Sequence, residues 1–225
     1  ETGERLPVEE MFAGVKQKNP DVLVHCDCVQ GFGKILFSLN RIKADMVTMS
    51  SHKIHGPKGC GAIYVREGVN LRPLCFGGSQ ESRVRPGTEN VPGIAAFGHA
   101  SLKALRDIRE NWEHVKELNL YLRDCLQQME DVVINSPSGA VPYVLNISVL
   151  PFATEDLLHE MRMRGIYLSG SSACEKGARS HVIRAMGIEG PRADSVVRIG
   201  LGKKNTREEV TVLVETLNEL IKRGK

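Results

Sequence analysis

The sequence predicts an α/β fold, with a mixed, largely parallel sheet covered by helices on both faces and a smaller α+β domain after it. Three observations support this prediction. The 225 residues are 41% hydrophobic and 25% charged, which is the balance of a globular chain. Helical and strand-like patterns alternate over residues 7–66. After a long helical stretch at residues 92–129, the pattern changes to strands and helices in mixed order.

The first half of the chain begins with a predicted helix. Apolar residues within 7–18 recur at the i, i+3, i+4, i+7 spacing of an amphipathic helix. Short apolar and β-branched runs predict strands at residues 21–27, 45–49 and 62–66, and residues 71–76 are expected to pair with the last of them. This alternation is typical of a sheet with helices packed on it.

The second half follows the helical stretch at 92–129, whose length predicts a bend or a break. We place the domain boundary there, between residues 1–108 and 109–225. Extended segments are expected at 132–134, 144–149, 166–168 and 196–200. Thr154 is expected to cap a helix, and the Thr206 to Glu209 segment forms a capping box at the start of the last helix.

Charge and composition argue against several classes of protein. The formal net charge of +3 is too small to favour nucleic acid as a partner, and no apolar run approaches the roughly 20 residues that span a membrane. Six cysteines without a secretory signal favour a reduced, cytoplasmic protein over a disulfide framework. We expect no metal site, because His25, Cys26 and Cys28 cannot all lie on one face of a strand.

Two polar clusters follow predicted strands of the first half. Asp27 and Gln30 come at the carboxyl end of a strand, where open α/β sheets bind ligands, although Asp27 could equally cap the next turn. The segment from Ser50 to Gly59 contains hydroxyls and imidazoles that suit a phosphate. Its Lys53 could form a Schiff base with a carbonyl cofactor or be an ordinary solvated lysine.

Two further clusters lie in loops. Thr88 follows a glycine-rich segment and could donate to a phosphate, although the segment could also be a plain turn. It lacks the Walker and Gly-x-Gly-x-x-Gly patterns, so a nucleotide enzyme of either kind is not supported. Cys174 stands in a loop of small residues that suits a travelling nucleophile, with an incidental exposed thiol as the alternative.

In this order, the clusters resemble the cysteine desulfurases, which are pyridoxal-phosphate enzymes of the class V aminotransferase group and of fold type I. The resemblance covers essentially the whole chain. The segments that carry it are His25-x-Asp27-x-x-Gln30-x-x-Gly33-Lys34, Ser51-His52-Lys53-Ile54-x-Gly56-Pro57-Lys58-Gly59, Gly77-Gly78-x-Gln80-Glu81, Arg85-x-Gly87-Thr88-x-Asn90 and Ser169-Gly170-Ser171-Ser172-Ala173-Cys174.

The resemblance implies roles for residues that would bind pyridoxal 5'-phosphate. Lys53 resembles the lysine that binds the cofactor covalently and shuttles protons. Asp27 would hold the pyridine nitrogen protonated, and Gln30 would bond to the ring hydroxyl. Ser50 and His52 would bind the phosphate. Residues 1–108 would then be the C-terminal part of the large cofactor domain, and residues 109–225 the small domain with the catalytic cysteine loop.

The resemblance also implies a reaction and partners. Thr88 is similar to the threonine that reaches the phosphate of the opposite subunit, which implies a homodimer, and Arg198 to the arginine that binds the substrate carboxylate. L-cysteine would be converted to alanine, with its sulfur left as a persulfide on Cys174. The expected acceptor is an iron–sulfur scaffold protein or a tRNA-thiolation enzyme.

The chain departs from the family pattern in a few places. Cys26 and Cys28 flank Asp27 where small or apolar residues are usual, and Lys203 stands where an arginine is common. The sequence begins at Glu1-Thr2-Gly3, just after the expected place of two asparagines, so we expect an upstream segment to complete the site. A noncatalytic remnant that dimerises or binds partners, and a selenocysteine lyase, remain alternatives.

Overall fold

The computed structural model describes residues 1–170 and 180–224 and divides into two compact units. The N-terminal unit is Pro7–Arg109, and the C-terminal unit is Glu110–Lys225 together with Glu1–Leu6. The division at 109/110 lies beside the expected boundary at 108/109, but the first six residues join the C-terminal unit. They do so because Gly3 O accepts a hydrogen bond from Val141 N (2.8 Å) and Thr2 is buried.

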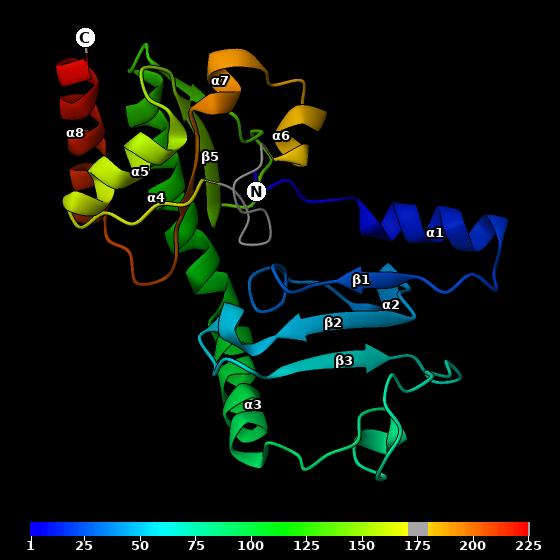
Figure 1. The fold of residues 1–225 in the computed structure, drawn as a ribbon. Helices are drawn as coiled ribbons and strands as arrows, with labels where there is room; N and C mark the ends of the chain where they lie inside the picture. Colours follow the sequence, from blue (N-terminus) through cyan, green and yellow to red (C-terminus); the bar gives the residue numbers. More distant parts are fainter. Residues whose placement is uncertain (171–179, 225) are drawn as a thin grey trace. The chain divides into compact units, whose positions relative to one another are not determined.

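The N-terminal unit is built on a three-stranded sheet of order β1-β2-β3 (Figure 1). Strand β1 pairs with β2 in parallel, and β2 pairs with β3 in antiparallel. Its elements are α1 (Val8–Lys18), β1 (His25–Asp27), α2 (Leu39–Ile42), β2 (Met46–Ser50), η1 (Ser51–Ile54), β3 (Gly61–Val65), η2 (Glu81–Arg83) and α3 (Val91–Arg106).

Two small apolar clusters hold this unit together. One consists of Ile42, Ala44 and Val47, with side chains of α1 packed against it. The other consists of Ile54, Phe97 and Ala104 and joins η1 to α3. Polar contacts of a buried carboxylate also stabilise this unit. Asp45 accepts hydrogen bonds from Val24 N (2.8 Å) and Lys16 Nζ (2.7 Å).

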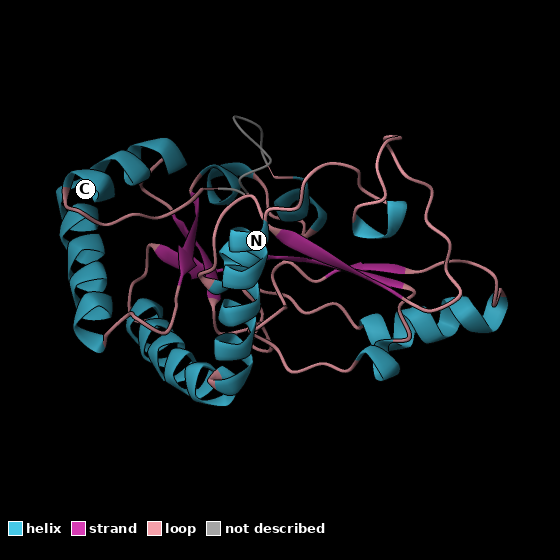
Figure 2. Ribbon diagram, turned by 90° about the horizontal axis from the view of Figure 1, so that it is seen from below, coloured by secondary structure: helices cyan, strands magenta, loops and turns pink. Residues whose placement is uncertain are grey.

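The C-terminal unit has an antiparallel sheet of order β4-β5-β6, with helices beside it (Figure 2). One continuous buried cluster joins this sheet to α4, α5 and α8. Strand β5 is its centre, because Leu145, Ile147 and Val149 are fully buried. The elements of this part are α4 (Ile108–Gln127), β4 (Val132–Ile134), β5 (Val144–Val149), α5 (Thr154–Met163), α6 (His181–Ala185), α7 (Gly190–Asp194), β6 (Val196–Gly200) and α8 (Arg207–Gly224).

The expected helices at 7–18 and 92–129 are found, and the second breaks at Asp107 into α3 and α4. The capping box is confirmed, because Thr206 N donates to Glu209 Oε2 (3.1 Å) and Glu209 N donates to Thr206 Oγ1 (3.3 Å). The α/β class is confirmed as well. The expected largely parallel sheet is not found, because among the described residues only the β1–β2 pairing is parallel, and the short connection through η1 returns β3 antiparallel to β2.

Three local expectations are wrong. Residues 71–76 form no strand, and Leu74 (99% exposed) and Phe76 (91%) face solvent, so β3 pairs only with β2 among the described residues and is an edge strand. Residues 166–168 are also outside any strand. Thr154 begins α5 without capping it, since its hydroxyl donates to the carbonyls of Asp194 (3.0 Å) and Val196 (2.9 Å).

None of the described helices has both the length and the apolar character needed to cross a membrane.

Candidate cofactor site

The carboxyl ends of β1 and β2 place two of the expected site residues at one edge of the sheet. The two strands are parallel, and Asp27 lies opposite Thr48, so Ser50 follows at the same edge two residues later. The Asp27 carboxylate accepts a hydrogen bond from Val29 N (2.9 Å). This contact is the turn-capping role that the sequence left open, and it fixes the carboxylate at the start of the next loop.

The loop after β1 turns back at once and carries Gln30. Cys28 O accepts hydrogen bonds from Gly31 N (2.9 Å) and Phe32 N (2.7 Å), which closes a helical turn. The exposed Gln30 side chain accepts a hydrogen bond from Lys34 Nζ (3.2 Å). Gln30 is therefore held within one turn of Asp27, with its amide NH₂ group available as a donor.

Gly33 brings this loop against the turn that carries Lys53. Its φ of +69° favours glycine, and a Cβ at this position would lie 2.7 Å from Ile54 Cγ2. Ile54 is buried against Phe97 and Ala104. The neighbour of Lys53 in the chain is thus anchored on two sides.

Ser50, His52 and Lys53 lie on the η1 turn that follows β2. Ser50 Oγ and His52 Nδ1 are 2.7 Å apart, so the hydroxyl and the imidazole form one polar pair. Lys53 is half-buried, while His52 is exposed. The Ser51 hydroxyl is fully buried and has no hydrogen-bond partner among the described residues. A Cβ on Gly56 would overlap that hydroxyl.

Thr88 lies in the exposed loop between β3 and α3. Two hydrogen bonds hold the loop in place. Gln80 Oε1 accepts a hydrogen bond from Gly87 N (3.2 Å), and Asn90 caps α3 by accepting a hydrogen bond from Gly93 N (3.2 Å). Thr88 stands between these two contacts, and its side chain is exposed.

Arg198 belongs to the C-terminal unit and lies on β6, opposite Asn146 of β5. Its backbone exchanges two hydrogen bonds with Ser169: Arg198 N to Ser169 O (2.6 Å) and Ser169 N to Arg198 O (3.2 Å). These bonds anchor the segment that leads into the expected cysteine loop. Cys174 itself lies outside the described residues.

The donor set of the N-terminal unit fits pyridoxal phosphate. A carboxylate suits a protonated pyridine nitrogen, an amide NH₂ suits a ring hydroxyl, and an amine suits an aldehyde. Asp27, Gln30 and Lys53 supply these groups at one sheet edge, and the Ser50–His52 pair supplies phosphate donors. The unpartnered Ser51 hydroxyl beside them is an additional donor.

Two features of this region have no counterpart in the sequence-based assignment. His25 Nε2 and Thr48 Oγ1 are 3.2 Å apart and lie on the same face of the sheet as Asp27. The sulfur atoms of Cys26 and Cys28 are 3.5 Å apart on the opposite face. The alternation of side chains along β1 indicates which residues share a face, but only the pairing with β2 identifies Thr48.

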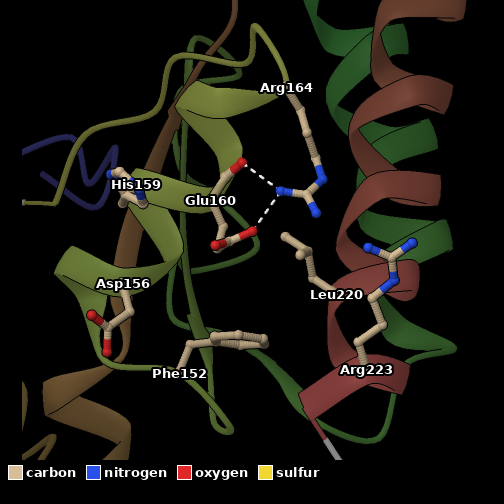
Figure 3. A pocket seen from close by; sticks show the side chains of 7 residues that line it. All are labelled: Phe152, Asp156, His159, Glu160, Arg164, Leu220 and Arg223. Atoms are coloured by element: carbon tan, nitrogen blue, oxygen red, sulfur yellow. Dashed lines mark hydrogen bonds and ion pairs between the residues drawn. The ribbon is translucent and has the colours of Figure 1, made fainter.

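A separate pocket lies in the C-terminal unit and contains none of the expected site residues. It has a volume of about 450 Å³ between α5 and α8 (Figure 3). Glu160 and Arg164 form an ion pair there (2.6 Å). The lining residues are Phe152, Asp156, His159, Glu160, Arg164, Leu220 and Arg223.

Comparison with known proteins gives a consistent result. The model of the family described as aminotransferase class-V matches residues 1–213. A cysteine desulfurase of Nostoc sp. is 37% identical over 99% of this chain and 56% of its own length. A solved NifS-like protein superposes with a TM-score of 0.91 at 37% identity, covering 99% of this chain and 58% of the other.

A NifS-like protein from Rickettsia africae superposes with a TM-score of 0.88 at 30% identity, covering 98% of this chain and 59% of that one. The chain thus spans just over half the length of the relatives it matches.

Proposed function

The chain belongs to the class V aminotransferase family, and we propose that it carries the site of a pyridoxal-phosphate-dependent cysteine desulfurase. One observation carries most weight. The parallel pairing of β1 and β2 brings Asp27 to the same end of the sheet as Ser50, which lies three residues before Lys53. The names of the relatives support the choice of cysteine as substrate.

The residues of the N-terminal unit would hold the cofactor by complementary groups. Asp27, fixed by Val29 N, would accept a hydrogen bond from the pyridine nitrogen and keep it protonated. Gln30 would donate to the ring hydroxyl, and Ser50 with His52 would bind the phosphate. When bound, pyridoxal phosphate supplies an aldehyde and a protonated ring that withdraws electrons from the substrate.

Three residues would act on the substrate. The Arg198 guanidinium would bind the carboxylate of L-cysteine in a bidentate contact. Lys53 Nζ would move the α-proton. The Cys174 thiolate would form an S–S bond to the substrate sulfur as the C–S bond breaks. In balance, L-cysteine and one thiol are converted to alanine and one persulfide.

The proposal extends to the surroundings of the site. Thr88 would bind the cofactor phosphate in the other subunit of a homodimer. In support of this role, its side chain is exposed, and hydrogen bonds hold its loop on both sides of it. The persulfide would pass to an iron–sulfur scaffold protein or a tRNA-thiolation enzyme in the cytoplasm. The relatives named as cysteine desulfurases support sulfur transfer.

Covalent trapping tests the role of Lys53. The protein is mixed with pyridoxal phosphate, reduced with borohydride and mapped by tryptic mass spectrometry. We expect the label on Lys53, and Lys53→Ala should abolish it. Lys58→Ala is the matched control, because Lys58 is an exposed lysine of the same glycine-rich segment, and it should leave labelling unchanged. Label at another lysine, or none, would refute the cofactor assignment.

A second assay tests the reaction. L-cysteine is added to the loaded protein, and alanine and protein-bound persulfide are measured. Cys174→Ser should keep the cofactor and lose the persulfide. Full persulfide formation in that variant would show that another group is the nucleophile. Turnover of selenocysteine without turnover of cysteine would favour the lyase.

A further inference from the structure

Cys26 lies on strand β1 and Cys28 is the first residue after it, and the two form a close thiol pair. Their sulfur atoms are 3.5 Å apart, within hydrogen-bond distance for sulfur. Both side chains are half-buried and pack against the cluster of Ile42, Ala44 and Val47. Because side chains alternate along a strand, Asp27 points from between them to the opposite face of the sheet. The thiol pair therefore lies on the face of the sheet opposite the Asp27 carboxylate, which is expected to bind the cofactor.

We propose that Cys26 and Cys28 are a redox modification site. A low-molecular-weight disulfide oxidises the two thiols, which then form a disulfide bond with each other. Formation of this bond displaces Asp27. The inference about closure needs only the thiol pair, and its consequence for Asp27 rests on the proposed function.

The geometry of β1 permits closure at a cost to the strand. Residues two apart in a strand have Cα atoms separated by about 6.6 Å, which is near the upper end of the range of about 4.4–6.8 Å seen in disulfides. The sulfur atoms must approach from 3.5 Å to about 2.05 Å. Closure therefore draws the two Cα atoms together and puckers the strand at the residue between them.

The neighbouring contacts identify what the pucker would disturb. Cys28 N donates to Thr48 O (2.9 Å), and Asp27 lies opposite Thr48 in the parallel ladder. The Asp27 carboxylate also depends on its contact with Val29 N (2.9 Å) for its direction. A shorter distance between the Cα atoms of Cys26 and Cys28 strains both contacts, so the Asp27 carboxylate changes position.

The environment of Cys28 sets the order of the steps. Burial, then the hydrogen bond to Cys26 and the charges of Cys26 and Asp27, raise the pKa of Cys28 to about 12. Cys28 thus keeps its proton at neutral pH, and Cys26 begins the exchange. Once Cys26 is in a mixed disulfide, its charge no longer opposes ionisation of Cys28.

The exchange balances in two steps. The Cys26 sulfur, having lost its proton to solvent, attacks the disulfide R–S–S–R, which forms a protein–S–S–R bond and releases one thiol after protonation. Cys28 then loses its proton and attacks Cys26, which forms the Cys26–Cys28 bond and releases the second thiol. The protein loses two electrons and two protons, and the small disulfide gains them.

Alkylation mapping in glutathione buffers tests the closure. The protein is equilibrated at increasing ratios of oxidised to reduced glutathione, alkylated and digested with trypsin. The peptide of residues 19–34 contains Cys26 and Cys28 and no other cysteine. We expect it to lose both alkylation sites together and to be lighter than the dithiol by two hydrogen atoms. The exposed Cys75, in the peptide of residues 67–83, should form only the mixed disulfide.

Variants separate pair closure from ordinary thiol oxidation. In Cys26→Ser and in Cys28→Ser the remaining cysteine should stop at the mixed disulfide with glutathione, because the second step needs both sulfur atoms of the pair. If the wild-type peptide keeps two alkylation sites, or stops at one mixed disulfide, under conditions that convert Cys75, the closure is refuted. That result needs no variant and no cofactor.

The effect on Asp27 is measured as cofactor affinity. Closure should weaken binding of pyridoxal phosphate by about tenfold, which corresponds to about 1.4 kcal/mol. A reductant should restore the affinity. In the Cys26→Ser/Cys28→Ser double variant the oxidant should leave the affinity unchanged. Equal affinity of the closed and reduced wild-type forms would refute the displacement of Asp27. If the reduced protein binds no cofactor, the proposed function fails, while the mapping result for the pair still stands.

Discussion

The two units differ in how they are stabilised. The C-terminal unit has one continuous apolar cluster around β5, and Leu122, Leu145 and Leu217 within it are fully buried. The N-terminal unit has two clusters with only three buried side chains each. It also exposes apolar side chains along α3, where Leu102 is 73% exposed. Buried apolar area is the main source of folding free energy, so this difference predicts unequal stability.

The expected cofactor residues lie in the less densely packed unit. Their positions depend on short-range contacts rather than on a deep core: Asp27 on Val29 N, and Ser50 on His52. Local hydrogen bonds fix direction but contribute only about 1 kcal/mol each. Local hydrogen bonds therefore order the expected cofactor residues, whereas apolar burial orders the C-terminal unit.

The largest expected effect comes from truncating the core of the C-terminal unit. Leu145→Ala should lower the free energy of unfolding by about 2–5 kcal/mol, because it removes a fully buried side chain and leaves a cavity. The matched change Leu102→Ala should stay within about 0.5 kcal/mol. Urea unfolding followed by fluorescence of Trp112, which packs on Tyr143 in this unit, measures the first change. Equal losses from the two substitutions would contradict the comparison.

A polar substitution should have the next largest effect. Asp45→Ala leaves the Val24 N–H without its acceptor and separates Lys16 from its partner, so we expect a loss of about 1–3 kcal/mol in the N-terminal unit. Hydrogen exchange of the β1 and β2 amides measures this loss. Asp124→Ala, at an exposed acidic residue of α4, is the control. If β1 and β2 exchange no faster in the Asp45 variant, the buried carboxylate does not stabilise this unit.

The same carboxylate predicts a pH dependence. Burial acts to raise the pKa of Asp45, but the contacts with Lys16, Val24 N–H and Arg66 outweigh it, and the pKa is lowered. A lowered pKa gives stability that is present above the unfolded-state value of about 3.9 and is lost as the pH falls through the folded-state value below it. The difference in hydrogen-exchange protection of the β1 and β2 amides between wild type and Asp45→Asn should therefore shrink below about pH 4. Protection is compared after correction for the intrinsic exchange rate at each pH. A difference that grows toward low pH would show that the sign is wrong.

The smallest expected effects come from the helix caps, and they should be similar in both units. Thr206→Ala removes the capping box of α8, and Asn90→Ala removes the cap of α3. Each should cost about 1 kcal/mol, because a cap is a local contact that does not depend on the core around it. Local hydrogen exchange at the first turn of each helix measures both. A cap that costs several-fold more in one unit would show that capping is coupled to packing.

The sequence was sufficient for features that arise from neighbouring residues. The helices at 7–18 and 92–129 follow from apolar spacing, and the capping box follows from Thr206 and Glu209. The order of the polar clusters gave the family, which the match over residues 1–213 confirms. The roles of Lys53, Asp27, Arg198 and Cys174 remain predictions.

Other features could not be predicted because they depend on long-range pairing. Residues 71–76 resemble a strand by composition, yet they pair with no strand of the described residues, and Leu74 and Phe76 lie in solvent. Thr154 resembles a cap, but its hydroxyl binds carbonyls about forty residues away, at Asp194 and Val196. Propensity describes what a residue favours locally, and tertiary partners decide which option it takes.

The residue types alone establish which chemical groups this chain offers: a lysine after a strand, an aspartate at the end of another strand, and a cysteine on each side of that aspartate. The tertiary structure alone decided which of them meet. Parallel pairing of β1 with β2 brings Asp27 and Ser50 to one end of the sheet, and the sulfur atoms of Cys26 and Cys28, on either side of Asp27 in the chain, lie 3.5 Å apart on the opposite face. The chemical group at each position depends on that residue alone, whereas the register of a strand depends on how many residues on both faces of the sheet pack together.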